Sequence, residues 1–200
     1  MKRVCFVCGL FWLMTVGLAS AAPVGPEQLV KQTSDRVITE IKTNGESYRS
    51  DPDRLHALVN EVVLPNFDFE AMTDLALGRH RDKVSIEQKP VIVDEFRTIL
   101  VRTYSSALLE YTDQTLVFLP MEGDESDGEV VVRSEIEQAG GFPIPINYSL
   151  RKGEDGWKVF DISVDDVSLV TNFRSSFSRA IKKNGVDGLI ETLQSRNQGQ

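Results

Sequence analysis

Apolar residues in the N-terminal half of the chain recur at helical spacing. The first such face follows Pro26 and precedes Asn44-Gly45, a pair that typically ends a helix. Its members are Leu29, Val30, Val37, Ile38 and Ile41. The pattern therefore predicts a first helix that begins near residue 26 and ends near residue 44.

A second helix is predicted from Asp51-Pro52, a capping residue followed by a first-turn proline. Its apolar face is Leu55, Leu58, Val59, Val62 and Val63, and Pro65 is expected to end it. Asp68 is placed to cap a short third helix that Gly78 terminates. That helix carries Phe69, Met72 and Leu75 on its apolar side.

Residues 85–88 form a capping-box pattern, but Pro90 falls inside the turn that they would start. We therefore expect a kink or a restart there. From Phe96 onward the periodicity is uninterrupted for about four turns, which predicts the longest amphipathic helix of the chain. Its face is Phe96, Ile99, Leu100, Thr103, Tyr104, Ala107, Leu108 and Tyr111.

After residue 111 the sequence pattern changes, and β-branched and aromatic residues recur at every second position. Strands are predicted at residues 115–119, 129–137 and 142–151, with a fourth that begins near Trp157. An acidic turn at residues 122–128, the pair Gly140-Gly141 and residues 153–156 separate them. Four successive strands with short turns predict an antiparallel meander.

The fourth strand leads directly into the last helices. Phe160, Ile162 and Val164 alternate along the strand, and Asp165 or Asp166 is expected to cap the helix that follows. The helix carries Val167, Val170, Phe173, Phe177 and Ile181, and Asn184-Gly185 is expected to stop it. A final short helix is predicted at residues 187–193. The whole is an α+β domain, in which a helical layer packs on a twisted four-stranded antiparallel sheet.

Aromatic and aliphatic side chains from both layers are expected to meet between helices and sheet. This set is Tyr104, Leu108, Phe160, Ile162, Val164, Phe173 and Phe177. A filled core is the common outcome of such a pattern. Periodicity does not distinguish a filled core from the wall of a cavity.

Residues 1–21 have the features of a signal peptide: a basic start, an apolar run and the small residues Ala19 and Ala21 before the expected cut. Their removal takes away Lys2, Arg3 and both cysteines, so the formal net charge changes from −8 to −10. We expect residues 22–200 to form a single soluble domain, exported to an oxidising compartment such as a periplasm. The acidic balance argues against nucleic acid as a partner.

Candidate catalytic chemistry is sparse. His56 and His80 have no metal-ligand spacing, and we expect no metal and no cofactor. The acidic cluster at residues 124–129 is expected to be a solvated turn. Asp161, Asp165 and Asp166 are the carboxylates that could act as acid or base. The sequence does not indicate an enzyme.

Four segments resemble the MlaC or toluene-tolerance family of periplasmic phospholipid-binding proteins. The first is Val63-Leu64-Pro65-Asn66-Phe67-Asp68-Phe69 with Met72 and Leu77-Gly78-Arg79-His80. The others are residues 96–111, the third-strand run at residues 145–150, and residues 156–175 with 185–190. The chain departs from the family pattern at Arg81, where the family usually carries an aromatic residue.

The resemblance implies a cone-like fold, related to nuclear transport factor 2, that encloses a deep apolar pocket for lipid acyl chains. It implies a carrier, with phospholipid as cargo, that passes lipid between an outer-membrane lipoprotein–porin complex and the substrate-binding subunit of an inner-membrane ABC transporter, and so maintains outer-membrane lipid asymmetry. The residues expected to contact lipid are Val63, Phe67, Phe69, Met72, Leu75, Phe96, Leu100, Tyr104, Leu108, Tyr111, Ile146, Tyr148, Phe160, Ile162, Val164, Val167, Val170, Phe173 and Phe177.

Two other hypotheses stay open from the sequence. One is a cone-fold isomerase or hydratase, with Asp161 or Asp165 as a base beside Tyr104. It requires a carboxylate buried inside the cavity. The other is a non-catalytic envelope scaffold, which requires a solid core.

Overall fold

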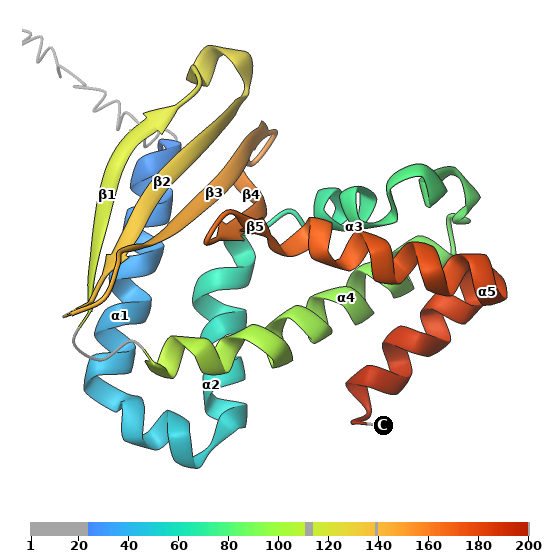
Figure 1. The fold of residues 1–200 in the computed structure, drawn as a ribbon, viewed down its shortest axis with the longest axis horizontal. Coiled ribbons are helices and arrows are strands. Elements are labelled where there is room, and N and C mark those ends of the chain that lie inside the picture. Colours follow the sequence, from blue (N-terminus) through green and yellow to red (C-terminus); the bar gives the residue numbers. More distant parts are fainter. Residues whose placement is uncertain (1–23, 111–113, 139, 200) are drawn as a thin grey trace, which may run out of the picture.

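The computed structural model describes residues 24–110, 114–138 and 140–199, and it places a helical part beside a five-stranded sheet (Figure 1). The signal peptide predicted for residues 1–21 lies outside the described residues. Within the described ranges, no helix is long and apolar enough to cross a bilayer.

Helix α1 (Pro26–Ser50) is longer than the sequence predicts, because it continues through Asn44-Gly45. The Asn44 amide donates to Glu40 Oε2 at 2.9 Å, so this side chain is accommodated within the helix. One turn further on, Tyr48 is buried and donates to the same carboxylate at 3.0 Å. Burial of Tyr48 stabilises a turn that local propensity alone would end.

Helix α2 (Pro52–Leu58) begins as predicted, with Asp51 accepting a hydrogen bond from the Asp53 amide. It continues as a π-helical turn, η1 (Val59–Val63), and a 3-10 turn, η2 (Leu64–Asn66). Helix α3 (Phe69–Leu77) also forms as predicted. The Asp68 side chain caps it, and Gly78 ends it with a φ of 52°.

The 3-10 helix η3 (Gly78–Lys83) leads to α4 (Gln88–Tyr104). The capping box forms, since Ser85 and Gln88 exchange hydrogen bonds, and Pro90 lies in the first turn, where its missing N–H needs no partner.

The prediction that this is the longest helix was wrong. Helix α4 has 17 residues, against 25 in α1, and it tightens after Tyr104 into the 3-10 helix η4 (Ser105–Glu110). There the Ser105 hydroxyl bonds to the Val101 carbonyl, an alternative partner for the backbone.

The sheet is an antiparallel meander of five strands in the order β1-β2-β3-β4-β5. The strands are β1 (Thr115–Glu122), β2 (Glu129–Glu137), β3 (Ile144–Gly153), β4 (Gly156–Val164) and β5 (Val167–Ser168). The sequence predicts four strands and misses β5. Asp165 and Asp166 have φ angles of 51° and 60°, so they form a two-residue hairpin turn that pairs Val164 with Val167.

This turn also corrects the predicted cap of the last helix, because Asp165 and Asp166 are used in the hairpin. Ser168 caps α5 (Leu169–Asn197) and accepts a hydrogen bond from the Thr171 amide at 3.0 Å. Asp161 of β4 supports the same end by accepting hydrogen bonds from Ser168 Oγ and the Val170 amide.

Helix α5 breaks where the sequence predicts a stop. Gly185 has φ 73° and ψ −170°, a conformation that only glycine adopts readily. The second half of α5 contains the predicted helix at residues 187–193 and extends it to Asn197. The bend turns the C-terminal half back beneath α4 (Figure 1).

The buried apolar residues form three separate clusters. The helical cluster joins α3, α4 and α5, with Phe96 in edge-to-face contact with Phe173 and Phe177 at 5.0 and 5.1 Å between ring centroids. The sheet cluster joins Val30 of α1 to β2, β3 and β4. The α1–α2 cluster joins Val37, Ile41 and Tyr48 to Leu55, Leu58 and Val62. Domains of this size usually have one contiguous core, so the division into three raises the question of what lies between the clusters.

Candidate functional site

The pairing of the strands gives the sheet one apolar face and one face of mixed character that carries most of its polar residues. Val130 pairs with Leu150, Val132 with Tyr148, and Ser134 with Ile146, so these side chains share the face that α1 covers at Val30. We call this the inner face. It also carries Leu116, Phe118, Ile136, Ile144, Val159, Ile162 and Val164. The opposite face presents Arg133, Glu135, Asn147, Ser149 and Ser163.

Burial along the inner face decreases from one end of the sheet to the other. Val130, Val132, Leu150 and Val159 are no more than 3% exposed. Beyond them Ser134 is fully buried, but the apolar inner-face residues are only half-buried, and Val164 is 37% exposed. The half-buried group is Leu116, Phe118, Ile136, Ile144, Ile146, Tyr148 and Ile162. An apolar face that no buried side chain covers is the wall of an opening rather than of a core.

Half-buried apolar residues also lie at the edges of the helical cluster and the α1–α2 cluster. Val63, Leu108 and Leu109 pack at the edge of the α1–α2 cluster, and Tyr104 packs at the edge of the helical cluster. Phe67 packs against both the helical cluster and the sheet cluster. Val63 lies in the π-helical turn η1, and Leu108 and Leu109 lie in the 3-10 helix η4. Irregular segments of this kind are often found at functional sites.

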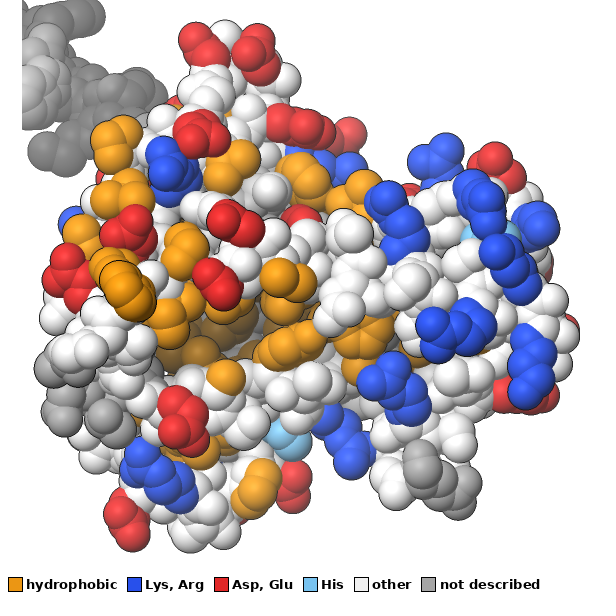
Figure 2. Space-filling view, viewed as in Figure 1, with side chains coloured by type: hydrophobic (Ala, Val, Ile, Leu, Met, Phe, Trp, Pro, Cys, Tyr) orange, Lys and Arg blue, Asp and Glu red, His pale blue; other side chains and the backbone are white. Residues whose placement is uncertain are grey.

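Figure 2 shows the result on the molecular surface. The surface is hollowed between the sheet and the helical part, and hydrophobic side chains gather on the floor of this hollow. The sheet lies on one side of it, and the C-terminal end of α4 on another (Figure 1). We refer to this feature as the apolar hollow.

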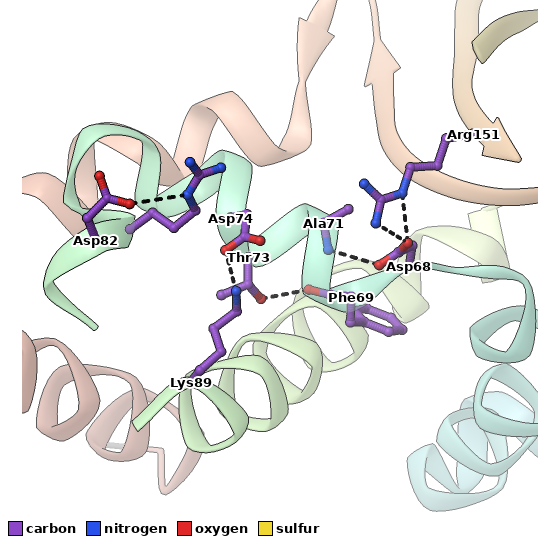
Figure 3. Close-up of polar contacts among 9 residues, drawn as sticks. Asp68, Phe69, Ala71, Thr73, Asp74, Asp82, Lys89 and Arg151 are labelled. Carbon is purple, nitrogen blue, oxygen red and sulfur yellow. Dashed lines mark hydrogen bonds and ion pairs between the residues drawn. The ribbon is translucent and has the colours of Figure 1, made fainter. Parts of the chain in front are cut away.

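Asp68 fixes a junction between the helices and the sheet (Figure 3). Its Oδ1 accepts from the Ala71 amide at 2.9 Å, and its Oδ2 accepts from Arg151 of β3 at 2.8 and 2.6 Å. The Asp68 amide donates to the Val159 carbonyl at 2.8 Å, beside a bridge between Phe67 and Val159. The segment that carries Phe67 is thereby attached along the edge of β4.

The side chains of Tyr148 and Ser134 place polar groups among the apolar residues of the inner face. The Tyr148 hydroxyl is within hydrogen-bonding reach of Ser34 of α1 and Ser134 of β2. Burial raises the pKa of Tyr148 above its ordinary value of 10.0, while the two serines act in the opposite direction. The phenol therefore remains neutral and adds no charge to this face.

The predicted lipid-contact residues separate into distinct groups. Ten are half-buried: Val63, Phe67, Phe69, Leu75, Tyr104, Leu108, Ile146, Tyr148, Phe160 and Ile162. Six are buried in the helical cluster: Met72, Phe96, Leu100, Val170, Phe173 and Phe177. Val164 and Val167 are exposed at the end of the sheet, and Tyr111 lies outside the described residues. Contact of any of them with a ligand stays a prediction.

Sequence reasoning missed part of the inner face, namely Leu116, Phe118, Ile136 and Ile144. Alternation within the first two strands was the available signal, because Leu116, Phe118 and Ile136 each lie two positions from another inner-face residue or opposite one. Pairing register was needed to show that these strands share one face with Ile146 and Tyr148.

The candidate carboxylates lie in turns or at the start of a helix, where they have structural roles. Asp165 is exposed in the β4–β5 turn, which contradicts its proposed place inside a cavity. Asp161 is half-buried, and both of its oxygens accept hydrogen bonds at the start of α5. Asp124 accepts from the Ser126 amide at 2.8 Å in an exposed turn, as predicted for the acidic cluster. Among the described residues, no group of three or more His, Cys, Asp or Glu is placed to hold a metal ion.

Two further depressions on the surface are poor candidates for an apolar ligand. One, of about 560 Å³, lies at the start of α1 beside Glu125 and is lined mainly by polar and charged residues. The other, of about 220 Å³, lies between α3 and α4 and includes Glu70, Lys89 and Arg97. The apolar hollow is therefore the surface that best suits a hydrophobic ligand.

Comparison with known proteins identifies the family. A sequence model of the MlaC protein family matches residues 31–195, nearly the whole described chain. The chain belongs to the MlaC family. This confirms the resemblance seen in the sequence motifs, and the likeness to a nuclear-transport-factor-2 cone stays a prediction.

Two curated MlaC relatives match along most of their length. The toluene tolerance protein ttg2D of Pseudomonas putida is 26% identical over 179 residues, which cover 89% of this chain and 83% of that protein. The intermembrane phospholipid transport system binding protein MlaC of Haemophilus influenzae is 27% identical over 193 residues, which cover 94% of this chain and 88% of that protein.

A solved structure extends the similarity to the fold. The phospholipid-binding protein from Ralstonia solanacearum, in complex with a phospholipid, superposes with a TM-score of 0.80 at 32% identity. The match covers 89% of this chain and 98% of that chain. The architecture described above is thus shared with a protein that holds a phospholipid.

Proposed function

We propose that this protein is a periplasmic phospholipid carrier that holds acyl chains in the apolar hollow and carries lipid between the two membranes. The observation that carries the proposal is the half-buried inner face of the sheet, together with the hollow in front of it (Figure 2). The phospholipid complex of the similar Ralstonia protein and the name of the Haemophilus relative, a phospholipid transport binding protein, support it.

The energetics of lipid transfer explain why a hollow of this kind is needed. A diacyl phospholipid has roughly 30 methylene groups, and exposure of each to water costs about 0.8 kcal/mol. A lipid in free solution therefore faces a cost on the order of 20 kcal/mol. A carrier with apolar walls replaces the membrane interior during transit, and it releases its lipid readily only if its affinity is close to that of the bilayer.

Our proposed contacts for the acyl chains are Leu116, Phe118, Ile136 and Ile144 with eight of the ten half-buried predicted residues. The two left out are Phe69, which lines the depression between α3 and α4, and Leu75, which lies beside Arg174. Leu, Ile, Val, Phe and Tyr side chains bind hydrocarbon through contact area, which does not depend on the headgroup. We therefore expect weak selection among headgroups, which would lie at the mouth of the hollow.

The proposal includes the export and the partners implied by the family. Residues 1–21 act as a cleaved signal peptide, and residues 22–200 form the single lipid-binding domain. Lipid passes between an outer-membrane lipoprotein–porin complex and an inner-membrane ABC transporter, and the direction is set by these partners. The protein needs no catalytic residue for this role.

Lipid extraction tests the proposal. The mature protein, purified without detergent, is extracted with organic solvent, and its lipids are identified by mass spectrometry. We expect about one phospholipid molecule or more per protein molecule, with a mixture of headgroups. Loaded protein should also deliver labelled lipid to acceptor vesicles. Protein that is always free of phospholipid, or that carries lipid but never releases it, would contradict the carrier function.

A further inference from the structure

Positive charge gathers at the end of the helical part that lies away from the sheet (Figure 2). Residues 69–104 and 169–197 carry 11 Lys and Arg against 8 Asp and Glu, whereas residues 115–168 carry 4 against 12. The part formed by α3, α4 and α5 is therefore basic and the sheet strongly acidic, so the mature chain combines a net charge of −10 with a pronounced charge asymmetry.

Four of these cations come together where η3 meets the first half of α5. Arg79 and Lys83 belong to η3, and Arg174 and Lys182 belong to α5. We call these four residues the basic corner. Within the described part of the chain, none of the four has a carboxylate within 4 Å. Neighbouring cations of the same part, Arg81, Lys89 and Arg97, are by contrast paired with Asp82, Asp74 and Asp94.

Specific contacts join the two elements that carry the corner. Arg174 Nε donates to the Leu75 carbonyl at 2.9 Å, and its side chain packs over Gly78. His80 is 5% exposed between the two elements, and its Nε2 lies 3.0 Å from Ser178 Oγ. The cations therefore project from a junction that buried contacts hold in place.

The surroundings of His80 show that negative charge is missing from this junction. Burial lowers the pKa of His80 below 6.5, and Lys83, Arg79 and Lys182 lower it further. All the charges that act on this imidazole are positive, and its Nδ1 has no hydrogen-bond partner among the described residues. Like charges held together without compensation destabilise a fold, which makes such a cluster a candidate for binding an anion.

The corner lies far from the apolar hollow, since η3 and the bend of α5 are at the opposite side of the view in Figures 1 and 2. A headgroup whose acyl chains fill the hollow would not reach it. An anionic bilayer is also a poor fit, because a flat surface would contact the exposed Asp82 and Asp187 at the same end. A partner protein can place its acidic side chains against the four cations alone.

We propose that Arg79, Lys83, Arg174 and Lys182 form a docking surface for an acidic region of a partner protein. The charge asymmetry of the molecule orients it during approach, with the acidic sheet held away from the same partner. This inference goes beyond lipid carriage and does not depend on it.

A charge-reversal pair with a matched control tests the docking surface. The test variant is Arg79→Glu with Lys182→Glu, and the control is Lys31→Glu with Lys152→Glu, which changes net charge equally at exposed sites elsewhere. The probes are a fluorescent peptide of ten glutamates and vesicles that contain phosphatidylglycerol. We expect peptide binding that weakens with salt and falls by about tenfold or more in the test variant, but not in the control. Equal losses in both, or loss of vesicle binding alone, would overturn the proposal.

Cross-linking in cells tests the same surface with its own partner. A photoreactive phenylalanine analogue at Lys83 should give a protein adduct that the Arg79→Glu, Lys182→Glu background removes and the control background keeps. An adduct with lipid only, or no adduct, would contradict a protein docking surface. Lipid loading is measured in the same proteins. Unchanged loading with lost docking supports the inference, whereas absent loading in all variants counts against the carrier function and not against the docking surface.

Discussion

At the scale of single residues, His80 connects two elements through packing, a hydrogen bond and electrostatics. It is buried between η3 and α5, bonds to Ser178, and faces three cations. From the sequence it is one of two histidines without metal spacing, and nothing in its neighbours indicates burial. Only the approach of η3 to α5 places Lys182, which is 102 positions away in the chain, beside it.

The lowered pKa of His80 predicts a specific dependence of stability on pH. The unfolded chain binds a proton near pH 6.5 and the folded protein only at lower pH, so stability falls as the pH drops below 6.5. A His80→Gln variant keeps a partner for Ser178 and lacks this titration. We expect the free energy of unfolding of the wild type, relative to this variant, to decrease below pH 6.5, with a slope of at most about 1.4 kcal/mol per pH unit.

Urea denaturation of both proteins across this range measures the difference directly. Other titrating groups are common to both, so they cancel in the comparison. A difference that stays constant from neutral pH to about pH 5 would show that His80 titrates normally in the folded protein.

At the scale of elements, α5 depends on one backbone conformation. Gly185 lies outside the regions that L-residues occupy, and its bend lets Leu189 and Leu193 reach the helical cluster. We expect Gly185→Ala to cost about 1–3 kcal/mol of stability, because an alanine there must strain the backbone or straighten the helix.

Gly128 provides the matched control for this prediction. Its φ of 78° and ψ of 0° fall in the left-handed region that asparagine tolerates, and nothing lies within 4 Å of an added Cβ. Gly128→Asn should therefore change stability by less than about 0.5 kcal/mol. The midpoint of urea denaturation measures both effects, and we expect a clear decrease only for Gly185→Ala. Equal shifts in the two variants would refute a special role for Gly185.

The helices and strands illustrate what sequence patterns can and cannot predict. Residues with a local chemical signature behaved as expected: Asp51 and Asp68 cap helices, Gly78 ends one, and the second strand keeps its predicted bounds. The failures occurred where tertiary contacts outweigh local preference. Burial of Tyr48 carries α1 through Asn44-Gly45, and the turn at Asp165 and Asp166 converts two expected caps into a hairpin.

At the scale of the whole molecule, the candidate site is a gap between clusters, which no local pattern encodes. Apolar residues alternate along the strands in the sequence, but whether another side chain covers them depends on how the helices pack against the sheet. Phe96 and Phe173 show the difference, because their periodicity resembles that of Leu108 and yet they are buried in the helical cluster. Family membership narrowed the function where periodicity could not.

Lipid loading of paired variants tests the central claim most directly. Ile146→Asp places a charge on the half-buried inner face, and Leu119→Asp places one on the opposite face, across from Arg133. Native mass spectrometry of the purified proteins should show phospholipid on the wild type and on Leu119→Asp. We expect loading of Ile146→Asp to fall by about tenfold or more while its circular dichroism spectrum remains native. The reason is that acyl chains bound against this wall would strip the carboxylate of its hydration, which is costly. Full loading of Ile146→Asp, or equal loss in both variants, would contradict acyl-chain binding in the apolar hollow.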